Sequence, residues 1–176
     1  MIHVERGSEP DGFVERSVDW KNRLEEANGQ NPQLTPSQFW SCVRDEIRSD
    51  AQALYEVFHG KCAFCEAKMA HVSSPQVEHY RPKSRFPDQM FNWYNWLLSC
   101  GRCNDKKWSH FPECDGQPCL LDPTVDEPGD HLTFLRAQVL GKTRRGEETV
   151  RIVGLARSEL ERERVQWLMV IDLLLL

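Results

Sequence analysis

The sequence predicts an α+β fold: a mainly helical chain built around a small core of two short strands and a helix. Two observations support this. Apolar residues recur at helical spacing before residue 60 and after residue 145. Between residues 61 and 123 lie six of the seven cysteines and most of the ten prolines. A segment of this composition is typical of short strands and turns, so the ends of the chain supply helices and the centre supplies the rest.

The chain of 176 residues has the length of one ordinary domain, and its 40% hydrophobic content is that of a folded globule. We therefore expect a single compact domain with three consecutive parts. Residues 1–60 would form a helical scaffold and residues 61–123 the functional core. Residues 124–176 would form short strands and helices that pack on the core or on a partner.

Three helices are expected in the N-terminal part. Residues 10–27 form a weak amphipathic pattern that ends at an Asn-Gly pair. Thr35 is a good N-cap for a second helix, because Pro36 follows in the first turn and Gln38 stands three residues after the cap. A third periodic run ends at Gly60. The apolar faces of these helices are expected to pack in the core.

The centre contains two candidate strands. The segment SPQVEHYRP, residues 74–82, alternates enough for a short strand, and NWLLSC, residues 95–100, is its expected partner. A short helix can begin at Gly101. Further along, the chain is turn-rich with one or two short strands, and two helices are expected over residues 146–155 and 157–176.

The ends of the chain bear on its location. The N-terminus lacks the basic, apolar and small-residue series of a secretory signal, so we expect a cytoplasmic protein. The apolar end, VQWLMVIDLLLL, runs about twelve residues and contains Asp172, whereas a membrane-spanning helix needs about twenty apolar residues. We expect this end to dock on another subunit, by self-association, or else to pack back on the helices of residues 10–58.

The net charge of −5 argues against binding of nucleic acid by the whole protein surface, because such electrostatic binding depends on Lys and Arg side chains that neutralise phosphates. The charge is unevenly distributed, however. From His79 to His110 there are six basic residues against two acidic ones, so the middle of an acidic chain is basic. Such runs are most often solvated faces, and this one gains meaning only from its neighbours.

Two CxxC pairs, Cys62 with Cys65 and Cys100 with Cys103, have the spacing of zinc knuckles. Tetrahedral Zn²⁺ accepts four thiolates from two such pairs. A zinc ion so bound has no open position for water, so the site is expected to be structural. Four unrelated buried thiols, or thiol redox chemistry, are the alternatives. The 34 residues between the pairs form a loop large enough to contain another site.

Cys114 and Cys119 stand five apart and are flanked by prolines, which is wrong for a zinc knuckle. We expect them, like Cys42, to be ordinary thiols, because a reducing compartment and an odd number of cysteines disfavour disulfides. A second metal site at this pair is the alternative.

The loop between the CxxC pairs resembles the HNH endonuclease family in its ββα-metal form. The resemblance lies in VEHYRPKSR, FNWYNWLLSC and CGRCNDKK, where the spacing of four separate elements agrees. It implies that Glu78 and His79 are the acidic-His pair on the first strand and that Asn95 is the asparagine before the second strand. Asn104, directly after the second CxxC, would be the terminal metal ligand.

Phosphodiester hydrolysis suits these residue types. His79 is the candidate general base, because imidazole is the side chain whose unperturbed pKa lies nearest neutrality. Glu78 and Asn104 offer oxygens to a catalytic divalent ion, and Asn95 would fix the loop that orients the imidazole. The expected phosphate contacts are Arg81, Lys83, Arg102 and Lys107.

Two residues depart from the family's usual pattern: Asn104 stands where many members have His, and Glu78 where many have Asp. An amide binds Zn²⁺ or Ni²⁺ less well than imidazole, which favours Mg²⁺ or Mn²⁺ at the catalytic site. The longer arm of Glu78 allows contact with the metal directly or through water. Asn104 as a helix cap and His110 as the terminal ligand are alternatives. Three aromatic residues either stack on bases or, as is commoner, pack in the core: Trp93, Tyr94 and Trp96.

A narrower resemblance covers nearly the whole chain, from MIHVERGSEP at the start to RRGEETVRIVGLARSELERER near the end. These segments are similar to the PtuB group, the HNH proteins of retron and Septu anti-phage systems. The resemblance implies an effector nuclease, cutting DNA or else RNA, that assembles with an ABC/SMC-like, PtuA-like ATPase. The competing interpretation is a catalytically inactive, zinc-stapled module that binds nucleic acid or the ATPase.

Overall fold

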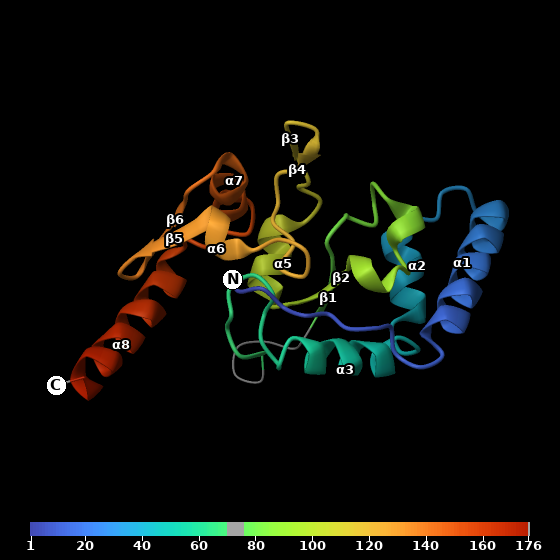
Figure 1. Cartoon of the computed structure of the whole chain (residues 1–176). Helices are drawn as coiled ribbons and strands as arrows, with labels where there is room; N and C mark the ends of the chain where they lie inside the picture. The colour runs from blue at the N-terminus through green and yellow to red at the C-terminus, as the bar shows by residue number, and fades with distance from the viewer. Residues whose placement is uncertain (70–75, 176) are drawn as a thin grey trace. The chain divides into compact units, whose positions relative to one another are not determined.

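The computed structural model describes residues 1–69 and 76–175, and its secondary structure is α+β, as the sequence predicts (Figure 1). In the described residues, each of three small sheets is one antiparallel pair of strands. The helices are α1 (Phe13–Gln30), α2 (Pro36–Val43), α3 (Arg48–Val57), α5 (Gly101–Lys107), α6 (Pro128–His131), α7 (Arg144–Ile152) and α8 (Ser158–Leu174). The strands are β1 (Gln76–His79), β2 (Trp96–Ser99), β3 (Glu113–Cys114), β4 (Gln117–Pro118), β5 (Leu132–Leu135) and β6 (Gln138–Gly141). Two short 3-10 helices, η1 (Pro87–Gln89) and η2 (Trp93–Asn95), precede β2.

The contacts between residues divide the chain into two compact units. The N-terminal unit consists of Glu5–Cys62 and Ala67–Gly101. The C-terminal unit consists of Met1–Val4, Ala63–Glu66 and Arg102–Leu176. These units cut across the three consecutive parts expected from the sequence, because short early segments pack with the C-terminal residues.

Local capping signals explain where the first helices begin. Thr35 accepts a hydrogen bond from the backbone N–H of Gln38, and the Gln38 side chain accepts one from the N–H of Thr35. This is the capping box that the sequence predicts. α1 extends to Gln30, past the Asn-Gly pair at which the sequence predicts its end. The apolar side chains on its buried face are Phe13, Trp20 and Leu24.

An aromatic cluster forms the core of the N-terminal unit. The ring of Phe13 meets the ring of Trp96 edge-on at 5.2 Å between centroids, and the ring of Trp40 does so at 5.4 Å. Trp93 and Trp96 are buried, so their core-packing role is confirmed, whereas Tyr94 is 54% exposed. Because rings from α1 and α2 both pack on Trp96, these helices hold β2 in place.

The predicted pair of central strands is confirmed. β1 and β2 run antiparallel, with His79 opposite Trp96 and Glu78 opposite Leu97. Residues 74 and 75 of the expected first strand lie outside the described residues. Every residue of β2 is buried, and α5 starts at Gly101 directly after Cys100. The chain therefore runs strand, strand, helix, in the order that the ββα-metal resemblance implies.

One expectation was wrong: Cys114 and Cys119 form a disulfide and are not ordinary thiols or ligands of a second metal. β3 and β4 pair as a tight hairpin whose turn contains Asp115 and Gly116 at positive φ. This reversal places the Cα atoms of the two cysteines 5.0 Å apart, within the range of a disulfide. A spacing of five that is wrong for a knuckle is right for a cross-linked hairpin.

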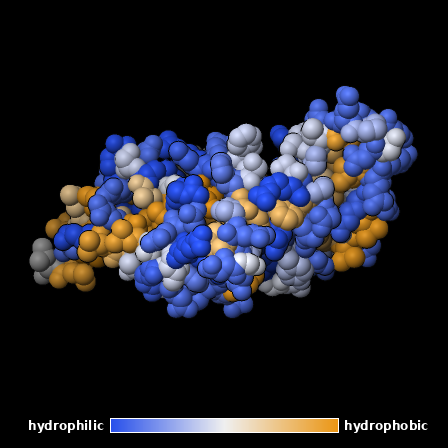
Figure 2. Space-filling model, turned by 90° about the horizontal axis from the view of Figure 1, so that it is seen from above, coloured by the Kyte–Doolittle hydropathy of each residue, from blue (hydrophilic) through white to orange (hydrophobic). Residues whose placement is uncertain are grey.

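The C-terminal unit ends in a helix that lies on the surface. β5 and β6 form a hairpin that packs against α7, and α8 follows with no buried residue. Its second half exposes large apolar side chains, among them Trp167 at 66% and Met169 at 65%. Figure 2 shows this apolar surface over α8. Among the described residues, no helix combines the length and the apolar content needed to cross a bilayer.

Candidate metal centre and histidine site

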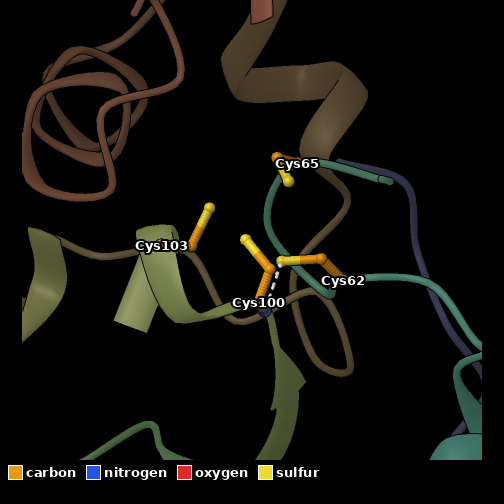
Figure 3. Close-up of side chains that lie close together, drawn as sticks. All are labelled: Cys62, Cys65, Cys100 and Cys103. Atoms are coloured by element: carbon orange, nitrogen blue, oxygen red, sulfur yellow. Dashed lines mark hydrogen bonds between the residues drawn. The ribbon is translucent and has the colours of Figure 1, made fainter. Parts of the chain in front are cut away.

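The four cysteines of the two CxxC pairs lie together, as Figure 3 shows. Their Sγ atoms all lie within 4.8 Å of one another. Cys62, Cys100 and Cys103 are buried, and Cys65 is half-buried. Cys62 and Cys65 come from the loop after α3, whereas the second pair spans the junction of β2 and α5. The predicted grouping of these cysteines is therefore confirmed.

Tight turns build the first knuckle. Gly60 adopts φ +64° and leads the chain out of α3, and an added Cβ would lie 2.6 Å from the Tyr55 hydroxyl, so the position requires glycine. The backbone N–H of Cys62 then donates to the carbonyl of Ala67 at 3.0 Å, which closes the loop around Cys65. The N–H of Cys100 donates to the Cys62 sulfur at 3.4 Å (Figure 3). N–H donors at a sulfur stabilise the thiolate form.

The donor set fits a structural zinc ion. Four thiolates in two CxxC pairs are the ligands of closed tetrahedral zinc sites, and their mutual repulsion when buried requires a cation. Zn²⁺ would be held by all four sulfurs and would tie the two knuckles together. Because all four positions would be filled by sulfur, the ion would have no open position for a water molecule.

Arg157 lies beside this group. Its Nη1 donates to the sulfur of Cys103 at 3.5 Å and to the carbonyl of Gly154 at 3.0 Å. Burial alone would lower the pKa of Arg157, but the charges and hydrogen bonds of Cys103 and Cys65 outweigh it, so the pKa lies above its ordinary value. No local sequence pattern indicates this contact, because Arg157 stands 54 residues from Cys103 in the chain.

His79 is held in one orientation within the N-terminal unit. It is 3% exposed, and its Nε2 lies 3.0 Å from the carbonyl oxygen of Met90. Because a carbonyl can only accept, Nε2 is the donor in this hydrogen bond, which selects the tautomer with the proton on Nε2 when the ring is neutral. The ring of Trp40 meets the imidazole edge-on at 4.5 Å between centroids. The same Met90 carbonyl accepts a second hydrogen bond, from Nε1 of Trp96 at 2.7 Å.

Asn95 clasps the loop that supplies the Met90 carbonyl. Its Nδ2 donates to the carbonyls of Arg81 at 3.1 Å and Gln89 at 2.9 Å, and its Oδ1 accepts from the N–H of Arg81 at 2.7 Å. The backbone adds a fourth link, from the N–H of Tyr80 to the Asn95 carbonyl at 2.8 Å. The side chain therefore joins both ends of the segment between β1 and η2.

Glu78 is 4% exposed and precedes His79 on β1, so the two side chains leave opposite faces of the strand. A carboxylate is costly to bury, and proteins hold such groups with hydrogen bonds, cations or metal ions. Glu78, His79 and Asn95 belong to the N-terminal unit. Asn104 is half-buried on α5 and is counted with the C-terminal unit.

The four expected phosphate contacts differ in exposure. Arg81 and Lys83 are half-buried, and the Lys83 ammonium lies 5.9 Å from the centroid of the Trp40 ring. Arg102 is exposed and forms a 3.2 Å ion pair with Glu159. Lys107 is different: it is fully buried, so in this conformation its ammonium is not at the surface where a phosphate would bind.

Sequence reasoning missed two groups at the histidine. Trp40 was assigned only to core packing, yet it is half-buried and touches the imidazole. The Met90 carbonyl is a backbone group, and no side chain reports it. The alternative terminal ligand, His110, is exposed, and its Nδ1 lies 3.1 Å from the carbonyl of Lys107.

Comparison with known proteins identifies relatives. No protein-family profile matches the chain. A Septu protein PtuB of Bacillus thuringiensis is 38% identical over 104 residues, which cover 58% of this chain and 39% of that protein. A Septu protein PtuB of Bacillus mycoides (strain KBAB4) is 29% identical over 196 residues, covering 94% of this chain and 66% of that protein. These matches confirm the resemblance to the PtuB group. The chain spans 39% of the length of the first relative and 66% of that of the second.

Proposed function

We propose that this chain is a metal-dependent HNH endonuclease that hydrolyses phosphodiester bonds, with DNA as the first candidate substrate and RNA as the second. The observation that carries the proposal is the fixed imidazole of His79: a buried ring whose Nε2–H is held by the Met90 carbonyl. A histidine that only packs in a core does not need a hydrogen-bond partner on a loop that is itself fixed by the side chain of Asn95. Similarity to Septu PtuB proteins supports a role as the nuclease of an anti-phage system.

In the proposed reaction, Nδ1 of His79 accepts a proton from the attacking water. The imidazolium that forms keeps its Nε2–H bond to Met90, so the ring does not turn during the transfer. Asn95 keeps the carbonyl in place by holding the loop at Arg81 and Gln89. Trp40 packs against the ring and limits its rotation.

Glu78 and Asn104 are the proposed ligands of the catalytic ion. A carboxylate and an amide oxygen suit a hard ion such as Mg²⁺ or Mn²⁺ better than Zn²⁺ or Ni²⁺. When bound, such an ion stabilises the charge that builds on the phosphate oxygens and on the leaving oxygen. Arg81, Lys83 and Arg102 are the proposed phosphate contacts, whereas Lys107 is left out because it is buried.

The proposed partner is an ABC/SMC-like, PtuA-like ATPase: the relatives are named as Septu proteins, and the resemblance to the PtuB group implies such a partner. A cytoplasmic location is part of the same proposal. The competing function is a catalytically inactive module that binds nucleic acid or the ATPase. That function requires the four cysteines and basic residues but gives no role to the hydrogen-bonded His79.

The test is a cleavage assay on several DNA and RNA substrates, with and without the co-expressed ATPase, Mg²⁺, Mn²⁺ and a chelator. We expect His79→Ala to lower the rate by about 100-fold or more, with unchanged zinc content and circular dichroism. His79→Gln is a second variant that fills the buried space. The matched control is His110→Ala, which removes an exposed imidazole. Cleavage by both His79 variants at the wild-type rate would disprove the general base, and an inactive wild type under every condition would favour the binding module.

Self-association through α8 is the last part of the proposal, and the proposed occupant is a second copy of this chain. The second half of the helix contains a single charged residue, Asp172, which faces Arg136 of the same unit at 3.8 Å. Beside it, a hollow of about 370 Å³ lies between the β5–β6 turn and α8, lined in part by Leu135, Val165 and Met169. Exposed apolar side chains beside a partly apolar hollow on one surface allow two copies to bury each other's residues.

A further inference from the structure

Arg157 occupies a position that the proposed reaction does not explain. It follows the turn at the end of α7, and its guanidinium is directed at the zinc-ligand candidate Cys103. Nη1 donates to the Cys103 sulfur at 3.5 Å, to the Gly154 carbonyl at 3.0 Å and to the Val153 carbonyl at 3.3 Å. Within the described residues, the buried Nε has no hydrogen-bond partner. Leaving a guanidinium donor unsatisfied is a cost, so the position requires a compensating contact.

The turn that carries Arg157 is well defined. Gly154 adopts φ +63°, a conformation that favours glycine, and the N–H of Leu155 returns to the Val150 carbonyl at 2.9 Å. Arg164 of α8 secures the same turn, because its Nη1 donates to the Leu155 carbonyl at 3.0 Å. Two arginines from different segments thus fix the backbone from which Arg157 reaches the sulfur.

The contact between Arg157 and Cys103 can offset the negative charge of a four-thiolate zinc site. Four thiolates and one Zn²⁺ carry a net charge of about −2, and arginine is always protonated. An N–H donor at a metal-bound sulfur withdraws electron density from it, and a thiolate with less electron density is a weaker nucleophile toward electrophiles and oxidants. Arg157 is only part-buried, so it can offset this charge without being desolvated completely.

We propose that Arg157 is the outer positioning cation of the zinc centre: it holds the Cys103 thiolate in place and shields it from electrophiles. The inference rests on the structural zinc site and not on nuclease activity. Because Cys103 directly precedes Asn104 on α5, the same contact steadies the first turn of the helix that carries the proposed catalytic ligand. A role limited to the carbonyls of Val153 and Gly154 is the competing explanation.

The experiment compares zinc loss from purified, zinc-loaded wild type, Arg157→Ala, Arg157→Lys and Arg151→Ala. Arg151→Ala is the matched control, because it removes the same charge from the exposed surface of α7. Among the described residues, the Arg151 side chain forms an ion pair only with Glu148. Zinc is released with excess N-ethylmaleimide, and separately with hydrogen peroxide, and is followed with a coloured zinc indicator. We expect release about 10-fold faster in Arg157→Ala, an intermediate rate in Arg157→Lys, and the wild-type rate in Arg151→Ala.

A second measurement covers the case in which Arg157→Ala does not fold. Co²⁺ replaces Zn²⁺ in the folded Arg157→Lys protein, and the sulfur-to-cobalt charge-transfer band reports electron density at the thiolates. We expect this band to shift from its wild-type position in Arg157→Lys and to stay in place in Arg151→Ala. Equal release rates in Arg157→Ala and Arg151→Ala, or an unshifted band in Arg157→Lys, would overturn the proposal, and neither result would bear on the nuclease assay.

Discussion

At the scale of single residues, the roles of the side chains around His79 can be predicted from the sequence better than the roles of the backbone groups. The spacing of Glu78-His79, Asn95 and the CxxC pairs singles out Asn95, whose side chain makes three hydrogen bonds to the loop between β1 and η2. The carbonyl of Met90 lies 3.0 Å from Nε2 of the ring, yet the identity of a residue does not indicate which hydrogen bonds its backbone carbonyl accepts. Roles that side chains play leave a pattern in the sequence, whereas roles that the backbone plays do not.

The first residue-scale prediction concerns Asn95. Asn95→Ala removes one acceptor and two donors from a side chain that is 3% exposed, leaving part-buried backbone groups of Arg81 and Gln89 without these bonds. We expect a loss of about 2–4 kcal/mol in the free energy of unfolding, measured by urea denaturation. Asn95→Asp keeps the acceptor but sets a carboxylate against two carbonyls, so it should also destabilise the protein.

The control for Asn95 is Asn92→Ala. Asn92 also has local hydrogen bonds, one of them from the N–H of Tyr94 at 3.0 Å, but it is only half-buried and does not join the ends of the loop. We expect its loss to cost about 1 kcal/mol. If both alanine variants lower the free energy of unfolding by the same amount, Asn95 acts only as a local cap and does not stabilise the loop by joining its two ends.

At the scale of elements, the features that could be predicted are those set by local chemistry. The capping box at Thr35 follows from residues three positions apart, and the pairing of β1 with β2 follows from two short segments that each have a strand-like composition. The disulfide of Cys114 and Cys119 could not be predicted from the cysteine count, because it depends on the tight β3–β4 turn that brings the two residues together. The burial of Lys107 depends on how α5 packs, which a count of nearby charges does not reveal.

A pH prediction belongs to the contact between α1 and the turn before α3. Hydrogen bonds from Arg23, and then from Trp20, lower the pKa of Glu46 to about 2. A lowered carboxyl pKa means that the contact stabilises the fold fully above about pH 4.5 and loses this effect as the pH falls toward 2. Because Glu46 and Arg23 are 44% and 41% exposed, the contribution is about 0.5–1 kcal/mol at neutral pH.

Glu46→Gln tests this sign, because glutamine keeps an acceptor for the indole of Trp20 and removes only the charge. The difference in unfolding free energy between wild type and variant should be largest at pH 7, decline below about pH 4.5 and vanish as the pH approaches 2. Both proteins protonate their cysteine thiolates alike at low pH, so the difference isolates Glu46. Asp45→Asn is the control, since Asp45 pairs only with Arg48, three residues away, among the described residues. A difference that does not change with pH would contradict the assignment.

At the scale of the whole molecule, the sequence predicted neither the two units nor their boundaries. A contiguous three-part division follows the chain, whereas the observed units exchange short segments: Met1–Val4 and Ala63–Glu66 are counted with the C-terminal residues. Non-local packing of this kind depends on contacts between residues far apart in sequence, and no local pattern encodes it. The apolar end of the chain is different, because its composition alone predicted that it would either dock on another subunit or pack back on residues 10–58, and α8 has no buried residue.

The last prediction tests that surface. If two copies pair through the second half of α8, the mass from light scattering should rise with concentration toward twice that of one chain. Met169→Glu places a charge on the 65%-exposed apolar face beside the hollow, and we expect it to weaken the pairing at least about 10-fold, equivalent to about 1.4 kcal/mol. Val14→Glu, at a 54%-exposed position on α1, is the matched control and should pair as wild type does. A variant ending at Arg164 should stay monomeric. A wild type that is monomeric alone but binds the ATPase through these residues would assign the surface to the partner, and equal self-association of all variants would exclude α8 from the contact.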